Sequence, residues 1–169
     1  MKFLLGTGNR NKAQEILSIW QEIMAETGAD HQLVFPWDMD GTPPDPEENG
    51  KTLSQNAYIK AKAFAEFYGL PAIADDTGLF VDALNGVPGI FAARYAGEGC
   101  TYDDNVAKML REMADIADEL RTARFMSIAC LSQPGGEKEN AVFCRGILEG
   151  SIAHERSGTG GFGYDAFLL

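Results

Sequence analysis

The chain has 169 residues, which fits a single domain large enough to bury its own core. Its 45% hydrophobic and 23% charged residues are ordinary for a globular protein, and no apolar run approaches the roughly 20 residues that span a bilayer. With 14 basic against 25 acidic residues the formal net charge is −11. This charge argues against a general nucleic-acid binder, because such proteins gain affinity by neutralising phosphates.

The first predicted unit is a strand, a glycine-rich turn and a helix. Residues 3–5 are apolar and predict a strand over residues 2–5, and the helical spacing from Ala13 to Met24 predicts an amphipathic helix that ends at Gly28. Such a turn points backbone N–H groups at an anion. Lys12 in the first helical turn opposes the helix dipole, so a bound anion would explain it. The alternative is an ordinary turn with a surface lysine.

A second strand is predicted at residues 32–35, followed by a loop rich in proline and acid at residues 36–51. Glu47 and Glu48 in this loop could supply a metal ligand, or the loop is simply solvated. Thr52 to Gln55 fits a capping box and predicts a helix that ends at Gly69. Lys60 lies off the apolar face of this helix and is a candidate site residue if the helix borders the site.

Two adjacent carboxylates follow the next apolar run. Residues 72–74 predict a buried strand that ends at Asp75 and Asp76, which places charge at the edge of a sheet. Burying two like charges is costly unless a cation or a proton compensates. The pair therefore either faces water or holds a cation.

The rest of the chain predicts a helix capped at Thr101 and a late hairpin with strands at residues 124–131 and 141–152. Two early helices and a late hairpin favour a mixed sheet over a purely parallel one. The cysteines, Cys100, Cys130 and Cys144, lack a CxxC spacing and indicate reduced thiols in a cytosolic protein. Cys130 and Cys144 fall in apolar runs, which predicts that both are buried.

Residues 158–163 formally satisfy GxGxxG, but they do not follow the first strand and open no helix, so the dinucleotide interpretation is rejected. Glycines also let a backbone lie against a ligand, and Phe162 and Tyr164 could then stack on a base with Asp165 as an acceptor. The alternative is a turn before a core strand with two packing aromatic residues.

Together, an anion-binding turn, a carboxylate pair, an acidic loop and a glycine-aromatic loop suit phosphates, a hard divalent cation and a planar base. These are the parts of a nucleotide site, and Arg94 follows the carboxylates closely enough to reach it. A carboxylate beside a metal favours a hydrolase, in which it binds Mg²⁺ or takes a proton from the attacking water.

Five motifs resemble, in order along nearly the whole chain, those of the inosine triphosphate pyrophosphatase family, which cleanses nucleotide pools. They are TGNRNK (7–12), EENGKT (47–52), PAIADDTGL (71–79), PGIFAARY (88–95) and GTGGFGYD (158–165). The resemblance implies an α/β fold, an elongated two-lobed domain around a mixed, twisted β-sheet with flanking helices. It also implies a homodimer that uses Mg²⁺ to hydrolyse ITP, dITP and XTP to the monophosphate and pyrophosphate. From the composition, charge and cysteines we expect a cytoplasmic protein with no nucleic-acid or membrane partner.

The resemblance also implies site residues. Asp76 would be the general base and a metal ligand, with Asp75 beside it and Lys12 as a further catalytic residue. Glu48, less surely Glu47, would be the second metal-side acid. The implied substrate-binding residues are Thr7, Gly8, Asn9, Arg10, Asn11, Lys12, Lys60, Thr77, Arg94, Phe162, Gly163, Tyr164 and Asp165.

The sequence departs from the family pattern at its end. Family members continue past FGYD with a lysine and a Ser-His-Arg segment that contact the base, whereas this chain stops at Leu169. We therefore expect one domain over residues 1–169 that lacks the base-reading segment. Two alternatives follow: a catalytically impaired nucleotide-binding module, or a different metal-dependent phosphohydrolase that releases orthophosphate.

Overall fold

The computed structural model describes residues 1–156, and the predicted strands and helices of that part of the chain all form. The main elements in chain order are β1 Lys2–Leu5, α1 Arg10–Thr27, β2 Gln32–Val34, α2 Leu53–Tyr68, β3 Ala72–Val81, β4 Pro88–Gly89, α3 Tyr102–Glu112, β5 Thr122–Ser132 and β6 Val142–Ser151. Short 3₁₀ turns lie at Pro36–Asp38, Asp82–Leu84, Ala92–Arg94, Asp118–Leu120 and Lys138–Asn140. The predicted glycine-aromatic loop, residues 158–165, lies outside the described residues.

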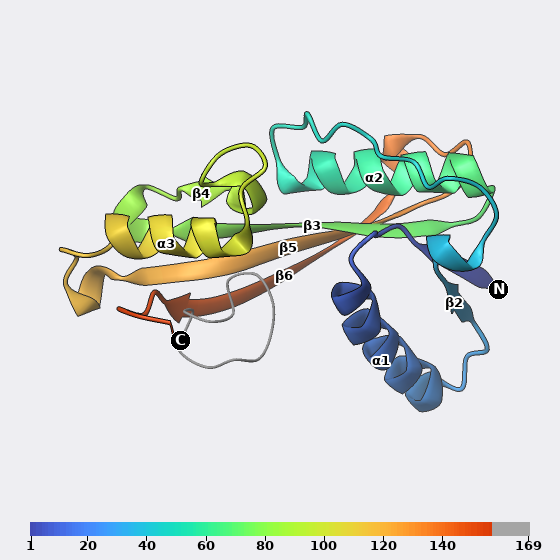
Figure 1. The fold of residues 1–169 in the computed structure, drawn as a ribbon. Helices are drawn as coiled ribbons and strands as arrows, with labels where there is room; N and C mark the ends of the chain where they lie inside the picture. Colours follow the sequence, from blue (N-terminus) through green and yellow to red (C-terminus); the bar gives the residue numbers. More distant parts are fainter. Residues whose placement is uncertain (157–169) are drawn as a thin grey trace. The chain divides into compact units, whose positions relative to one another are not determined.

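The described strands form a six-stranded sheet in the order β2-β1-β3-β5-β6, with β4 paired antiparallel to β3 (Figure 1). β1 is parallel to both of its neighbours, and its Leu4 pairs with Val34 on one side and Ala72 on the other. The neighbours β5 and β6 are joined by residues 133–141, which is too short for the crossover that parallel strands need. The prediction of an α/β fold around a mixed sheet is confirmed.

The chain divides into two compact units. The first unit comprises Met1–Asp76 and Ile128–Cys144, and the described part of the second comprises Thr77–Ser127 and residues 145–156. β3, β5 and β6 contribute residues to both units. The first unit contains β1, β2, α1 and α2, and with them most of the predicted site residues that the structure describes.

In the first unit, α1 and α2 cover opposite faces of β1 (Figure 1). The Phe3 ring lies 5.5 Å from the ring of Trp20 on α1, whereas Leu4 packs in a buried cluster with Phe64 of α2 and Ala72 of β3. Because successive side chains of a strand point to opposite faces, Phe3 and Leu4 assign one helix to each face. The same alternation in β3 determines where its two carboxylates point.

The helix ends follow the sequence with one difference. Asn9 caps α1, and Gly28 ends it in the left-handed region at φ 67°. Thr52 caps α2 by accepting a hydrogen bond from the Gln55 N–H at 3.2 Å. The return bond of the predicted capping box shifts by one residue, because the Gln55 side chain accepts from the Lys51 N–H at 2.6 Å.

The second unit has its own core, in which α3 packs on the C-terminal half of β3. Its largest fully buried side chains are Leu79, Val81, Val106, Met109, Met113 and Ile152. α3 begins with a complete capping box between Thr101 and Asp104. No helix in the described part of the chain has the length and apolar content needed to cross a membrane.

The cysteines confirm one expectation and correct another. Cys130 is buried in β5, and burial raises the pKa of its thiol to about 11. Cys144 is exposed, so the prediction that it is buried was wrong. Most of β6 is exposed, including the apolar Val142, Ile147 and Leu148, so an apolar run did not indicate burial here.

Candidate active site

The two adjacent aspartates lie in the middle of β3, so the prediction that a strand ends at them was wrong. β3 continues without a break to Val81. β1, in contrast, makes its last pairing between Leu5 and Ile73, and Gly6 then donates a backbone hydrogen bond to the Ile73 carbonyl. Asp75 and Asp76 therefore lie just past the carboxyl end of β1, the position at which parallel α/β sheets bind ligands.

The two carboxylates point to opposite faces of β3 and do not act as one pair. Asp75 lies on the α1 side, where its Oδ2 is 2.7 Å from Nζ of Lys12. Asp76 lies on the α2 side, where its Oδ1 is 3.5 Å from Nζ of Lys60. From the sequence, the two carboxylates either face water or hold a cation. The structure places a lysine ammonium beside each carboxylate. These lysines, which come from other elements, compensate the two carboxylate charges. The residues next to Asp75 and Asp76 in the sequence provide no such cation.

Asp76 is the more buried of the two, with 8% of its surface exposed. The Lys60 ammonium that contacts it also lies 3.1 Å from Oε2 of Glu48, so one cation serves two carboxylates. The side-chain amide of Asn56 donates to Oδ2 of Asp76 at 3.1 Å. Lys60 and Asn56 of α2 therefore contact this carboxylate, and Lys60 links it to Glu48 of the acidic loop.

Burial raises the pKa of the Asp76 carboxyl group above its ordinary value. The charge of Lys60 and the hydrogen bond from Asn56 lower this pKa in part, while the negative charge of Glu48 raises it. Because proton acceptors work best when their pKa lies near the working pH, the shift makes Asp76 better suited to accept a proton from water.

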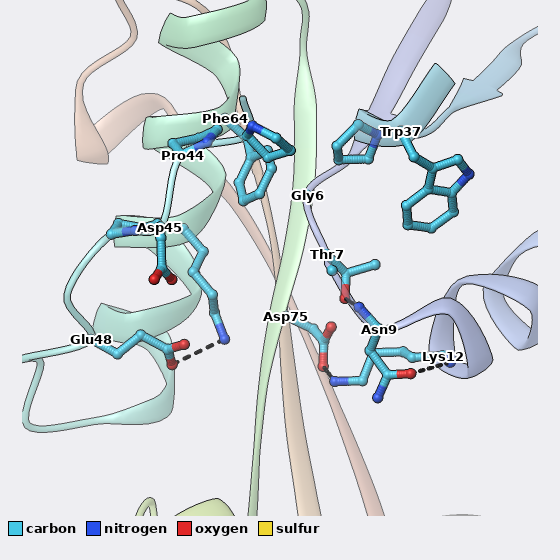
Figure 2. Close-up of a pocket in the computed structure, with 15 residues that line it drawn as sticks. Gly6, Thr7, Asn9, Lys12, Trp37, Pro44, Asp45, Glu48, Phe64 and Asp75 are labelled. Atoms are coloured by element: carbon cyan, nitrogen blue, oxygen red, sulfur yellow. Dashed lines mark hydrogen bonds and ion pairs between the residues drawn. The ribbon is translucent and has the colours of Figure 1, made fainter. Parts of the chain in front are cut away.

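A pocket of about 450 Å³ lies beside these groups, within the first unit. Figure 2 shows Glu48 on the α2 side of β3, and Asp75 with Lys12 on the α1 side. The pocket is lined by Gly6, Thr7, Gly8, Asn9, Lys12, Pro36, Trp37, Pro43, Pro44, Asp45, Pro46, Glu48, Lys60, Phe64 and Asp75. It combines two lysine–carboxylate pairs with an apolar wall and the predicted glycine-rich turn.

The glycine-rich turn is held largely by its own side chains. Asn9 Oδ1 accepts from the N–H groups of Asn11 and Lys12 at 3.0 and 3.2 Å. Thr7 Oγ1 accepts from the Asn9 N–H at 3.1 Å. The Asp75 contact also accounts for Lys12, which the sequence explained by a bound anion, so the structure gives this lysine a protein partner.

The acidic loop separates its two glutamates. Glu48 is half-buried and contacts Lys60, whereas Glu47 is exposed. Lys60 belongs to the site, because α2 borders the pocket. Arg10 lies with its guanidinium 4.7 Å from the ring of Trp37, and Asn11 is exposed at the start of α1.

The remaining predicted residues belong to the second unit or lie outside the described residues. Thr77, the first residue of the second unit, donates through its hydroxyl to Ser127 at 3.0 Å. Arg94 also belongs to the second unit, and its guanidinium lies 5.0 Å from the ring of Phe91. Phe162, Gly163, Tyr164 and Asp165 lie outside the described residues.

Sequence reasoning missed Asn56, which is 2% exposed and bonded to Asp76. Its helical position held a signal: it lies one turn before Lys60 and next to the apolar Leu53 and Ala57. A polar residue on a buried helix face needs a partner, and this could have singled it out. The apolar wall of the pocket, with Trp37 and Phe64, was missed as well.

The fold and the pocket define an α/β protein with a lysine–carboxylate site past the end of a parallel strand. The chain belongs to the Ham1 family, which it matches over residues 3–169. A dITP/XTP pyrophosphatase of Elusimicrobium minutum is 44% identical over 172 residues, which cover 100% of this chain and 83% of the relative. A dITP/XTP pyrophosphatase of Streptomyces coelicolor is 46% identical, over 99% of this chain and 80% of the relative.

The fold is also similar to solved structures. The structure of a HAM1 protein from Coxiella burnetii matches with a TM-score of 0.82 and 36% identity, over 99% of this chain and 81% of that chain. The resemblance that the five motifs indicated is therefore confirmed.

Proposed function

We propose that this protein is a nucleoside triphosphate pyrophosphatase that hydrolyses the noncanonical purine nucleotides ITP, dITP and XTP to a monophosphate and pyrophosphate. Relatives that align with 99% or more of the chain are named dITP/XTP pyrophosphatases. Within the molecule, the observation that carries the proposal is Lys60, held between Glu48 and Asp76 beside the pocket. A buried acid beside a pocket that is lined by two ammonium groups suits hydrolysis of a polyanion.

The proposed cofactor is Mg²⁺, and the residues present fit it. Glu48 and Asp76 offer carboxylate oxygens, the hard ligands that Mg²⁺ prefers. The described residues contain no group of three or more His, Cys, Asp or Glu side chains suited to a metal. Mg²⁺ is commonly held by one or two carboxylates and otherwise by water and substrate phosphates. When bound, Mg²⁺ would supply neutralisation of the phosphate charge.

The side chains around Asp76 have distinct proposed roles. Asp76 accepts the proton of the attacking water, for which its raised pKa suits it. Lys60 and Lys12 donate hydrogen bonds to phosphate oxygens on which negative charge develops. Asp75 orients Lys12 through their 2.7 Å contact, so it acts through the lysine and does not share the role of Asp76.

The rest of the substrate would be bound by the other predicted residues. Residues 7–11 and Arg94 would contact phosphates, Thr77 the substrate, and residues 162–165 the base. We further propose a cytoplasmic homodimer that acts on free nucleotides, with neither nucleic acid nor membrane as a partner. Light scattering of the purified protein tests the dimer.

The activity is tested by measuring pyrophosphate release from ITP, dITP, XTP, ATP and GTP in the presence of Mg²⁺. We expect turnover of the first three and, for Asp76→Asn, a loss in kcat of about 10²–10⁴-fold with the folded state retained. Full turnover by Asp76→Asn would refute the role of Asp76. Orthophosphate as the product would indicate a different phosphohydrolase, and binding of ITP without turnover a nucleotide-binding module.

A further inference from the structure

Asn56 joins two parts of the site that are far apart in the sequence. Its Nδ2 donates to Oδ2 of Asp76 at 3.1 Å, and its Oδ1 accepts from the backbone N–H of Gly50 at 2.8 Å. The side chain is nearly fully buried, at 2% exposure. One amide group therefore connects α2, the acidic loop and the carboxylate on β3.

The acidic loop approaches Asn56 too closely for any side chain at position 50. A Cβ on Gly50 would lie 2.5 Å from Oδ1 of Asn56 and 2.7 Å from Cβ of Gln55. The loop also contacts α2 through the Lys51 N–H, which donates to Gln55. Glu48 lies two residues before Gly50, so the end of the loop that carries Glu48 is fixed on the first turn of α2.

We infer that Asn56 is a positioning residue that holds Asp76 and the Glu48 loop in register for Mg²⁺ and the attacking water; this rests on the proposed function. The amide suits the task because it is a donor on one side and an acceptor on the other. Aspartate at this position would keep only acceptors, and an apolar residue would keep neither. Asn56 touches neither the phosphates nor the water in this role, because it acts through Asp76 and the loop.

The test compares Asn56→Ala with the wild-type protein in pyrophosphate release from ITP at saturating Mg²⁺. We expect kcat to fall about 10–100-fold, as is typical when a partner of a metal ligand is removed, with little change in KM. A second readout needs no activity: in metal-free protein, hydrogen exchange at the Gly50 amide should become at least about tenfold faster.

The variant Asn56→Asp distinguishes the effect of the bond to Asp76 from that of the bond to Gly50. It also tests the inference if Asn56→Ala does not fold. It keeps an acceptor for the Gly50 N–H but places an oxygen where Nδ2 donated to Asp76. We expect slow exchange at Gly50 together with a kcat that is still reduced. If this variant kept kcat within about twofold of wild type, the inference would be overturned.

Trp20 on α1 provides a control within the first unit. It is half-buried, its indole N–H donates to the His31 carbonyl at 3.1 Å, and it does not line the pocket. Trp20→Phe should lower stability but leave kcat per folded molecule unchanged. An equal loss of kcat in Asn56→Ala and Trp20→Phe would show a general folding effect and overturn the inference. Absence of turnover in the wild type would refute the proposed function instead, while the Gly50 exchange would still test the contact.

Discussion

Burial raises the pKa of the Asp76 carboxyl group from its ordinary 3.8, which means that the folded protein holds this proton more tightly than the unfolded chain. Its contribution to stability is therefore fully present below pH 3.8 and is lost as the pH rises through the folded-state pKa. At neutral pH the ionised Asp76 costs stability, as is common for groups that serve function.

Asp76→Asn should therefore stabilise the metal-free protein at neutral pH, because the neutral amide carries no buried charge and can still accept from Asn56. The gain should shrink as the pH is lowered towards the ordinary carboxyl pKa. Thermal unfolding in EDTA at a series of pH values between 5 and 8 measures this difference. A gain that grows as the pH falls would contradict the sign of the pKa shift.

Asp75→Asn is the contrasting variant at the same scale. It removes the charged partner that lies 2.7 Å from Lys12, and that lysine side chain is only 27% exposed. Leaving a partly buried charge without its partner destabilises a protein. We therefore expect Asp75→Asn to lower the melting temperature under conditions in which Asp76→Asn raises it.

At the scale of elements, the sequence predicted what depends on local pattern. Apolar spacing and caps located α1 and α2, and glycine located their ends. The course of β3 through Asp75 and Asp76 was not predictable in this way. A charged pair normally ends a buried strand, but here Lys12 and Lys60, from other elements, offset the two charges and allow the strand to continue. Glu48 and Asp76 could be identified from the sequence motifs, whereas the role of Asn56 depends on its contact with Asp76, 20 residues further along the chain.

The turn between β1 and α1 gives a prediction about how elements pack. A Cβ on Gly6 would lie 2.8 Å from the ring of Phe64, which is buried on α2, so Gly6→Ala forces the ring or the turn to move. Such overpacking costs about 1–3 kcal/mol. Gly8→Ala is the matched control, because a Cβ there meets nothing within 4 Å. In urea unfolding, the midpoint should be lower than that of the wild type for Gly6→Ala but not for Gly8→Ala. Equal midpoints for the two variants would show that the turn adapts freely.

At the scale of the whole molecule, a protein of net charge −11 has to bind a polyanion. The side chains that line the pocket do not give it a net positive charge. Its lining includes two lysines, Lys12 and Lys60, against three acids, Asp45, Glu48 and Asp75, and Asp76 contacts Lys60. The lysines are largely neutralised by their carboxylate partners, so a divalent cation is needed to make the site attractive to phosphates.

Removal of Mg²⁺ should therefore weaken nucleotide binding itself and not only turnover. With the α,β-imido analogue of ITP, which cannot be cleaved between those phosphates, calorimetry should give an affinity at least about tenfold lower in EDTA than in Mg²⁺. The salt dependence of binding further distinguishes the protein in EDTA from the protein in Mg²⁺. The screening length falls from about 30 Å at 0.01 M salt to about 8 Å at 0.15 M. In EDTA, added salt should strengthen binding, because it screens repulsion. If salt instead weakened binding in EDTA, Lys12 and Lys60 would outweigh the surrounding acids, and the cation would be required for the chemical step alone.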